Sequence, residues 1–391
     1  MTVRFASFNV ENLFARPKAL NTLTWAEGRP ILEAYAEFNA LIQLADYTPA
    51  IKARMIQLLL LVEVYRSDGG IIHRNRVTDP RWAWLRANRG AFDVDHEATG
   101  IEIVANNRSD WIGWLELAKE TINEPTVDMT ARVIQDVGAD VLGVVEAENR
   151  PALDHFNQER LIDPYEHVML IDGNDTRGID VGIMTTAQVE ILNIRSNVDA
   201  PDPGAPLEHL FSRDCAMYQC RLASGVIVWV LLNHFKSQSG GGGDKRFRQA
   251  EGVRRIVDDL VAGGETNIVV MGDLNEGPDS DAPGQPAENL APLYGPNSTL
   301  VDAYSIAGFN VGNRLGSFQN CSITNRLDYI FVSQPLAGLA TGGGLERHGL
   351  WGTPTNKNPP PPLTYWEIYG DLEGPEDAAS DHAAIFVDIN I

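Results

Sequence analysis

The chain has 391 residues, of which 44% are hydrophobic and 8% aromatic, enough to bury one large core or two smaller ones. Its 31 basic and 53 acidic residues give a formal charge of −22, and such a field repels polyanions. This balance argues against tight, non-specific binding of long nucleic acid. Three cysteines supply neither a disulfide framework nor a zinc-ligand set. The composition predicts a globular protein and still permits an enzyme that acts on phosphates through bound cations.

The amino terminus gives no targeting signal. Residues 1–14 enter an apolar alternating segment at once, without a charged lead, an apolar signal core and a cleavage site. The longest apolar run, at 55–62, is too short to span a bilayer. The location is therefore unknown, and we expect a cytoplasmic protein by default, or a secreted one if a signal has been removed.

The predicted elements begin with a strand at 3–10, where β-branched and aromatic residues alternate with small ones. Residues 20–125 then differ in character. Apolar residues recur at helical spacing in 31–45 and 49–65, and the segment holds five of the eight tryptophans. We predict that 20–125 is a mainly helical insertion with a small core of its own.

From residue 126 onward the pattern becomes that of an α/β protein. A helix is followed by the buried strand DVLGVVE, which ends on Glu146. A one-faced helix is predicted at 244–262, with Asp244 as its cap. The other predicted strands are 167–171, 178–185, 213–222, 226–235, 267–275, 326–333 and 382–391.

Polar side chains stand at the ends of most of these strands. Each one alone is explained as a turn former or a solvated strand end. Several strands that end at one edge of a core would instead bring the polar residues together, which predicts a functional site. The residues are Asn9, Glu11, Glu146, His234, Asp273, Asn275, Asp328, Asp381 and His382.

The segments FNVEN, VVEAEN, LLNHFKS, GDLNE, RLDYIFVS and SDHAAIF, in this order, resemble the endonuclease/exonuclease/phosphatase superfamily of metal-dependent phosphoesterases. This family includes apurinic endonucleases and pancreatic-type deoxyribonucleases. The resemblance covers 3–14 and about 126–391. It implies a four-layer α/β sandwich, with two mixed sheets face to face and helices outside. Residues 1–391 would then form one domain, interrupted by the insertion after its first strand.

The resemblance also implies a role for each strand-end residue. Glu146 is the first choice of metal ligand, and its oxygen donors suit Mg²⁺ or Mn²⁺, with Ca²⁺ also compatible. Asn9, Glu11 and Asp381 match further ligand positions, although the position of Glu11 is often Asp in relatives. The remaining matches are catalytic: Asp273 and Asn275 orient water and hold a phosphate oxygen, Asp328 fixes the tautomer of His382, and His234 is a second histidine at the phosphate.

The general base stays open at this point between Asp273 and the Asp328/His382 pair. Arg177 and Asp180 resemble a substrate-contacting segment, although a charged turn explains them nearly as well. Basic residues around the Gly-rich loop could bind a substrate phosphate, or form a solvated basic face. These are Lys236, Arg246 and Arg248.

The leading hypothesis is a metal-dependent phosphodiesterase that works by in-line attack of an activated water. NHFKS and GIDVGI resemble secreted bacterial nucleases, which favours nucleic acid as the substrate. The alternatives are a phosphomonoesterase or sphingomyelinase-like enzyme, and a non-catalytic binding protein with the same fold. No protein partner can be inferred. We expect 20–125 to influence substrate choice, because this segment leaves the chain just after Glu11.

Overall fold

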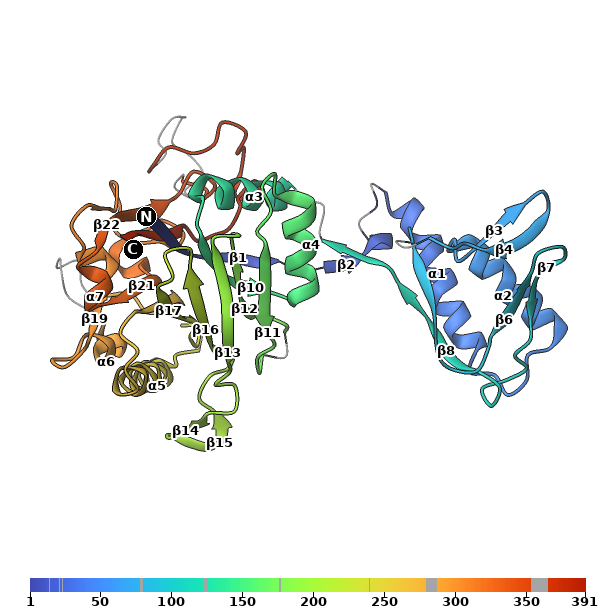
Figure 1. The fold of residues 1–391 in the computed structure, drawn as a ribbon. Helices are drawn as coiled ribbons and strands as arrows, with labels where there is room; N and C mark the ends of the chain where they lie inside the picture. The colour runs from blue at the N-terminus through green and yellow to red at the C-terminus, as the bar shows by residue number, and fades with distance from the viewer. Residues whose placement is uncertain are drawn as a thin grey trace. The chain divides into compact units, whose positions relative to one another are not determined.

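The computed structural model describes residues 1–13, 15–20, 22, 24–77, 80–121, 125–175, 177–238, 240–278, 287–352 and 365–391. The chain divides into two compact units (Figure 1). Unit 1 consists of Met1–Phe14 and Glu124–Ile391, and unit 2 consists of Ala15–Asn123. Within the described residues, no helix combines the length and apolarity that crossing a membrane requires.

Unit 1 contains two mixed sheets. The first has seven strands in the order β11 (His167–Ile171), β12 (Asp180–Thr185), β10 (Val141–Ala147), β1 (Thr2–Leu13), β23 (Ala384–Asn390), β22 (Ala340–Glu346) and β20 (Phe309–Asn310). The second has six strands in the order β13 (Val189–Arg195), β16 (Cys215–Leu222), β17 (Ile227–His234), β18 (Ile268–Asp273), β21 (Asp328–Ser333) and β19 (Leu300–Asp302). A small hairpin joins β14 (Pro201–Asp202) to β15 (Ala205–His209).

The two sheets pack face to face through one hydrophobic core. Val145 and Val181 of the first sheet share this core with Leu232 and Met271 of the second. A second core lies on the other face of the six-stranded sheet, where Val257 packs with strand residues. The helices of unit 1 are α3 (Pro125–Val137), α4 (Arg150–Arg160), α5 (Gly243–Ala262), α6 (Ala291–Tyr294) and α7 (Gln334–Ala337), and the longer ones lie outside the sheets (Figure 1). The predicted four-layer sandwich is confirmed.

Unit 2 corrects the prediction of a mainly helical insertion. Its described residues form two α-helices, α1 (Trp25–Leu41) and α2 (Pro49–Leu61). It also has four antiparallel strand pairs: β2 (Ala15–Pro17) with β9 (Lys119–Thr121), β3 (Tyr65–Asp68) with β4 (Ile71–Arg74), β5 (Ala83–Arg89) with β8 (Ile112–Leu117), and β6 (Asp93–His96) with β7 (Gly100–Ile103). Most of these strands are too short to show a clear alternation in sequence. The predicted small core exists, and it includes Phe38, Phe92 and Trp111.

Other differences are local. The predicted cap Asp244 lies inside the first turn of α5, and the cap position belongs to Gly242, whose φ of 92° suits a residue without a Cβ. Helix α4 and strands β13 and β22 were not predicted. The remaining predicted strands of unit 1 agree with the structure to within a few residues.

Candidate active site

The strand order explains why polar strand ends meet. Strands β1 and β10 run parallel, with Asn9 opposite Val145, so Asn9 and Glu146 lie at the same sheet edge. In the second sheet His234 lies opposite Asp273, and Asp273 lies opposite Asp328. The residue before Asp273 is Gly272. A Cβ at this position would come within 1.9 Å of the Asn233 carbonyl oxygen, so only glycine fits here.

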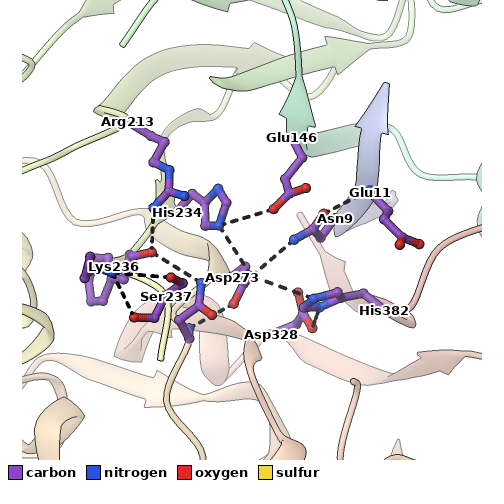
Figure 2. Close-up of polar contacts among 12 residues, drawn as sticks. Asn9, Glu11, Glu146, Arg213, His234, Lys236, Ser237, Asp273, Asp328 and His382 are labelled. Carbon is purple, nitrogen blue, oxygen red and sulfur yellow. Dashed lines mark hydrogen bonds and ion pairs between the residues drawn. The ribbon is translucent and has the colours of Figure 1, made fainter. Parts of the chain in front are cut away.

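Asp273 occupies the centre of the site (Figure 2). Its Oδ2 accepts hydrogen bonds from Asn9 Nδ2 at 3.2 Å and from Asn275 Nδ2 at 3.1 Å. Its Oδ1 accepts one from the backbone N–H of Asn275 at 2.8 Å. The Nε2 atoms of His234 and His382 lie 3.6 and 3.9 Å from the same Oδ2. Burial raises the pKa of Asp273 to about 7, although the charge of His382 opposes this rise.

The His382 ring is fixed on several sides. Its Nδ1 lies 2.7 Å from Asp328 Oδ2, which leaves Nε2 directed toward Asp273 (Figure 2). The ring of Phe318 packs against the imidazole with centroids 4.7 Å apart. The hydroxyl of Ser380 accepts from the backbone N–H of His382 and donates to the carbonyl of Asn9. Burial lowers the pKa of His382, but the Asp328 carboxylate and further acids outweigh this and raise it to about 10.

The second histidine has the opposite character. His234 is buried, and burial together with the positive charge of Arg213 holds its pKa well below the usual value. Arg213 is also buried, with Nε 3.0 Å from Asp175 Oδ2 and Nη1 donating to the carbonyl of Phe235 at 3.1 Å. The site therefore combines two buried cations, Arg213 and His382, with one neutral histidine.

Three further carboxylates, those of Glu11, Glu146 and Asp381, line the same pocket, and Glu146 Oε1 lies 3.7 Å from His234 Nε2. Burial and the charge of Asp381 raise the pKa values of Glu11 and Glu146, and burial raises that of Asp381. Carboxylates that repel one another are stabilised in their ionised form when a divalent cation lies between them. Their hard oxygen atoms are also the donors that such cations prefer. The described residues nevertheless contain no group of three or more His, Cys, Asp or Glu already arranged around a metal position. The donor chemistry fits a cation, and the ligand set is not drawn together.

These residues line one pocket of about 350 Å³. Most of the predicted catalytic and ligand residues are on its wall, whereas Asn9 and Asp328 are not among the lining residues. The lining residues are Glu11, Glu146, Arg177, Arg213, His234, Ser237, Gln238, Asp273, Asn275, Phe318, Leu327, Asp381 and His382.

Sequence reasoning missed Arg213, Asp175 and Phe318. The segment FSRDC read as the start of a strand, and the structure places Arg213 just before β16 with its side chain at the pocket. The sequence signal that could have found Arg213 is an arginine followed by an aspartate at the start of a buried strand. A buried guanidinium needs a charged or hydrogen-bonding partner, so such an arginine is expected to contact one.

Other predicted substrate-binding residues lie differently. Arg177 lines the pocket, but it is largely exposed and pairs with Asp175 at 2.8 Å. Asp180 is buried and accepts from the Gly173 N–H at 2.8 Å. Lys236 lies close to Ser237, with Nζ 3.4 Å from its hydroxyl.

The two arginines of α5 that were predicted to bind substrate, Arg246 and Arg248, pair with acids of the protein. Arg246 is buried against Glu276 and donates to the carbonyls of Lys236, Ser237 and Gly241. Arg248 pairs with Asp202 at 2.6 Å. The structure does not bring either guanidinium to the pocket wall.

Comparison with known proteins adds a family assignment. The model of the Endonuclease/Exonuclease/phosphatase family matches residues 118–297. These residues, somewhat under half of the chain, are therefore similar to this family. This similarity supports a phosphoester hydrolase, and enzymes of this family are generally dependent on a divalent metal. No curated protein matches the sequence.

Solved structures are similar at low identity. A truncated TDP2 of Caenorhabditis elegans is 16% identical, with 68% of this chain and 90% of that chain covered and a TM-score of 0.46. A mannosyl-6-phosphatase of Bacteroides thetaiotaomicron is 16% identical, with 68% and 91% covered and a TM-score of 0.48. The human Nocturnin catalytic domain is 13% identical, with 68% and 86% covered and a TM-score of 0.45.

Proposed function

We propose that the protein is a metal-dependent phosphodiesterase that hydrolyses its substrate by in-line attack of an activated water, with nucleic acid as the leading substrate class. The observation that carries this proposal is the arrangement around Asp273 Oδ2. Two amide N–H groups hold this oxygen, and two histidine Nε2 atoms of opposite electrostatic character flank it. Such a carboxylate is suited to orient a water for attack on phosphorus.

The proton-transfer roles follow from the same contacts. His382 shares its Nδ1 with Asp328, so a proton on this ring is stabilised and Nε2 can donate to a phosphate oxygen. This favours Asp273 as the general base and His382 as the electrostatic partner of the phosphate. The raised pKa of Asp273, about 7, supports the base role, since a base acts best near the working pH.

A divalent cation would be held by Glu146 and Asn9, with Glu11 and Asp381 beside them. When bound, it would polarise a phosphate oxygen and neutralise developing charge. We propose Mg²⁺ or Mn²⁺, because the donors are carboxylate and amide oxygens. The neutral His234 and the cationic Arg213 would then contact the phosphate from the side of the second sheet.

The charge of the pocket favours a diester over a monoester. Both buried cations already face a carboxylate, Arg213 facing Asp175 and His382 facing Asp328, and the exposed Arg177 shares Asp175 with Arg213. These contacts leave one positive charge of the three, which matches the single negative charge of a diester better than the two charges of a monoester. The apolar wall of Phe318 and Leu327 would suit a bulky second ester group.

The test is a substrate panel with Mg²⁺ or Mn²⁺: bis(p-nitrophenyl) phosphate, p-nitrophenyl phosphate, sphingomyelin and plasmid DNA. We expect the diester and the plasmid to be hydrolysed and the monoester to be poor by comparison. Preference for the monoester would favour a phosphatase, and inactivity on all four would favour a binding protein with this fold.

A further inference from the structure

One wall of the pocket around Asp273 comes from the Gly-rich loop, which the structure describes at residues 236–238 and 240–242. This loop joins the end of β17 to the start of α5. Ser237 and Gln238 are the loop residues that line the pocket. Both side chains are polar, so this wall can form hydrogen bonds with a bound substrate.

Arg246 of α5 connects the loop to the segment that carries the GDLNE motif. Its Nη1 donates to the carbonyls of Lys236, Ser237 and Gly241, each at 3.2 Å. Its Nε donates to the carboxylate of Glu276, the last residue of the motif. The guanidinium therefore uses one nitrogen atom for the loop and another for the segment of the catalytic aspartate.

Both ends of this connection are fixed by further contacts. Glu276 is buried, its Oε1 accepts from Asn289 Nδ2 at 2.7 Å, and its carbonyl accepts from the Tyr329 hydroxyl at 2.6 Å. On the loop, the backbone N–H of Lys236 donates at 3.0 Å to Oε1 of Gln249, a buried residue of α5. Movement of either end would leave a buried polar group without its partner, which costs free energy.

The composition of the loop explains why it needs contacts from outside. Gly240, Gly241 and Gly242 have φ values of 76°, 89° and 92°, a conformation that glycine adopts readily. Glycine also loses more conformational freedom on folding than any other residue. The hydrogen bonds from Arg246 oppose this entropic cost, so a loop without them would sample many conformations.

We propose that Arg246 is a positioning residue, which holds Ser237 and Gln238 beside Asp273 for contact with the substrate. The inference rests on the proposed function, because it takes this pocket as the site of the phosphate ester. The Ser237 hydroxyl oxygen accepts from Lys236 Nζ at 3.4 Å, so its own hydrogen can be donated to a substrate oxygen. The amide of Gln238 can both donate to and accept from a group of the ester.

Hydrogen exchange of the full chain tests the positioning role without any substrate. Arg246→Lys keeps a positive charge beside Glu276, but lysine has one nitrogen where arginine uses two and cannot serve both ends. The amides of Lys236 and Gly241 are hydrogen-bonded, so their exchange reports opening of the loop. We expect the peptide that contains 236–242 to exchange at least about tenfold faster in this variant, with β17 and β18 unchanged.

Arg254→Lys is the matched control. Arg254 lies on the same helix, pairs with Asp258 at 2.8 Å and donates to the carbonyls of Pro292 and Asn297. It has the same kinds of partner as Arg246, but neither it nor these partners line the pocket. The control should leave the exchange of 236–242 and the kinetics of hydrolysis at the wild-type values.

A double-mutant cycle tests whether the position of the loop matters to the substrate. The assay uses the ester of the panel that the wild type hydrolyses best. We expect Arg246→Lys, and the double variant Ser237→Ala/Gln238→Ala, each to raise KM by about three- to tenfold with a smaller change in kcat. The effects should fall well short of multiplying in the combined variant, because Arg246 acts through these two side chains.

Three results would overturn the proposal. They are unchanged exchange of 236–242 in Arg246→Lys, an unchanged KM in Ser237→Ala/Gln238→Ala, and effects on KM that multiply fully in the combined variant. The last result would give Arg246 a role in general stability only. A wild type that hydrolyses no ester of the panel would instead overturn the proposed function, and the exchange experiment would still decide whether Arg246 holds the loop.

Discussion

Replacement of Asp328 by asparagine tests the histidine that we place at the phosphate. The substitution keeps the volume of the side chain and removes its charge. The amide NH₂ of asparagine can also donate to Nδ1 of His382, which would stabilise the tautomer without a proton on Nδ1. The lost contact is a 2.7 Å bond to an ionised group, a type of bond that contributes about 1.5 to 3 kcal/mol. If the bond acts mainly in the transition state, kcat should fall by about 10- to 150-fold, with a much smaller change in KM.

The assay is hydrolysis of bis(p-nitrophenyl) phosphate at saturating Mg²⁺. Asp388→Asn is the matched control, because Asp388 makes an ion pair of the same length, 2.7 Å to Arg4, on β23. The control should keep nearly the full kcat. A kcat for Asp328→Asn within about threefold of the wild type would refute the orienting role of Asp328.

Three further outcomes are expected. Arg213→Ala should lower kcat/KM for the diester by at least about tenfold and Arg177→Ala by much less, because Arg213 is buried at the pocket whereas Arg177 is mostly solvated; equal effects would contradict this. Arg246→Met should lower the free energy of unfolding of unit 1 by about 3–5 kcal/mol, measured by hydrogen exchange of β18, because the Glu276 carboxylate is left buried without its ion pair. Arg248→Met should lower it by less than about 1.5 kcal/mol, since Lys245 still pairs with Asp202. Similar losses for both variants would contradict this reasoning. Hydrogen bonds from Arg177 and the charge of Arg213 outweigh desolvation and lower the pKa of Asp175 from 3.8 to about 2. The ionised carboxylate therefore stabilises the fold above about pH 4, and this contribution is lost as the pH falls toward 2. The melting temperatures of the wild type and Asp175→Asn should converge over this range, and a constant difference would refute the shift.

Much of the site was predictable because its signals are local. A polar residue at the end of a buried apolar run is visible in sequence, as at Glu146 and Asp273, and parallel strands bring such ends to one edge. Another local signal is the spacing of Cys215 and Cys220, which predicts that they lie on opposite faces of a strand. In the structure they lie in two different hydrophobic cores.

The missed features depend on contacts between distant segments. Arg213 is held at the pocket by Asp175, 3.0 Å from its Nε, and by the carbonyl of Phe235, which accepts from its Nη1 at 3.1 Å. Arg246 points inward because it forms an ion pair with Glu276, which lies just beyond the GDLN segment. Neither partnership follows from spacing along the chain. The hairpins of unit 2 escaped prediction because most of their strands have only three or four residues.

The central claim is that a divalent cation and the residues around Asp273 direct a water onto phosphorus. The most direct measurement is hydrolysis of bis(p-nitrophenyl) phosphate in ¹⁸O-labelled water after chelation, with and without added Mg²⁺, followed by mass spectrometry of both products. We expect product only when the cation is present, with ¹⁸O in p-nitrophenyl phosphate and none in p-nitrophenol. Full turnover without a cation, or ¹⁸O in the phenol, would contradict the claim.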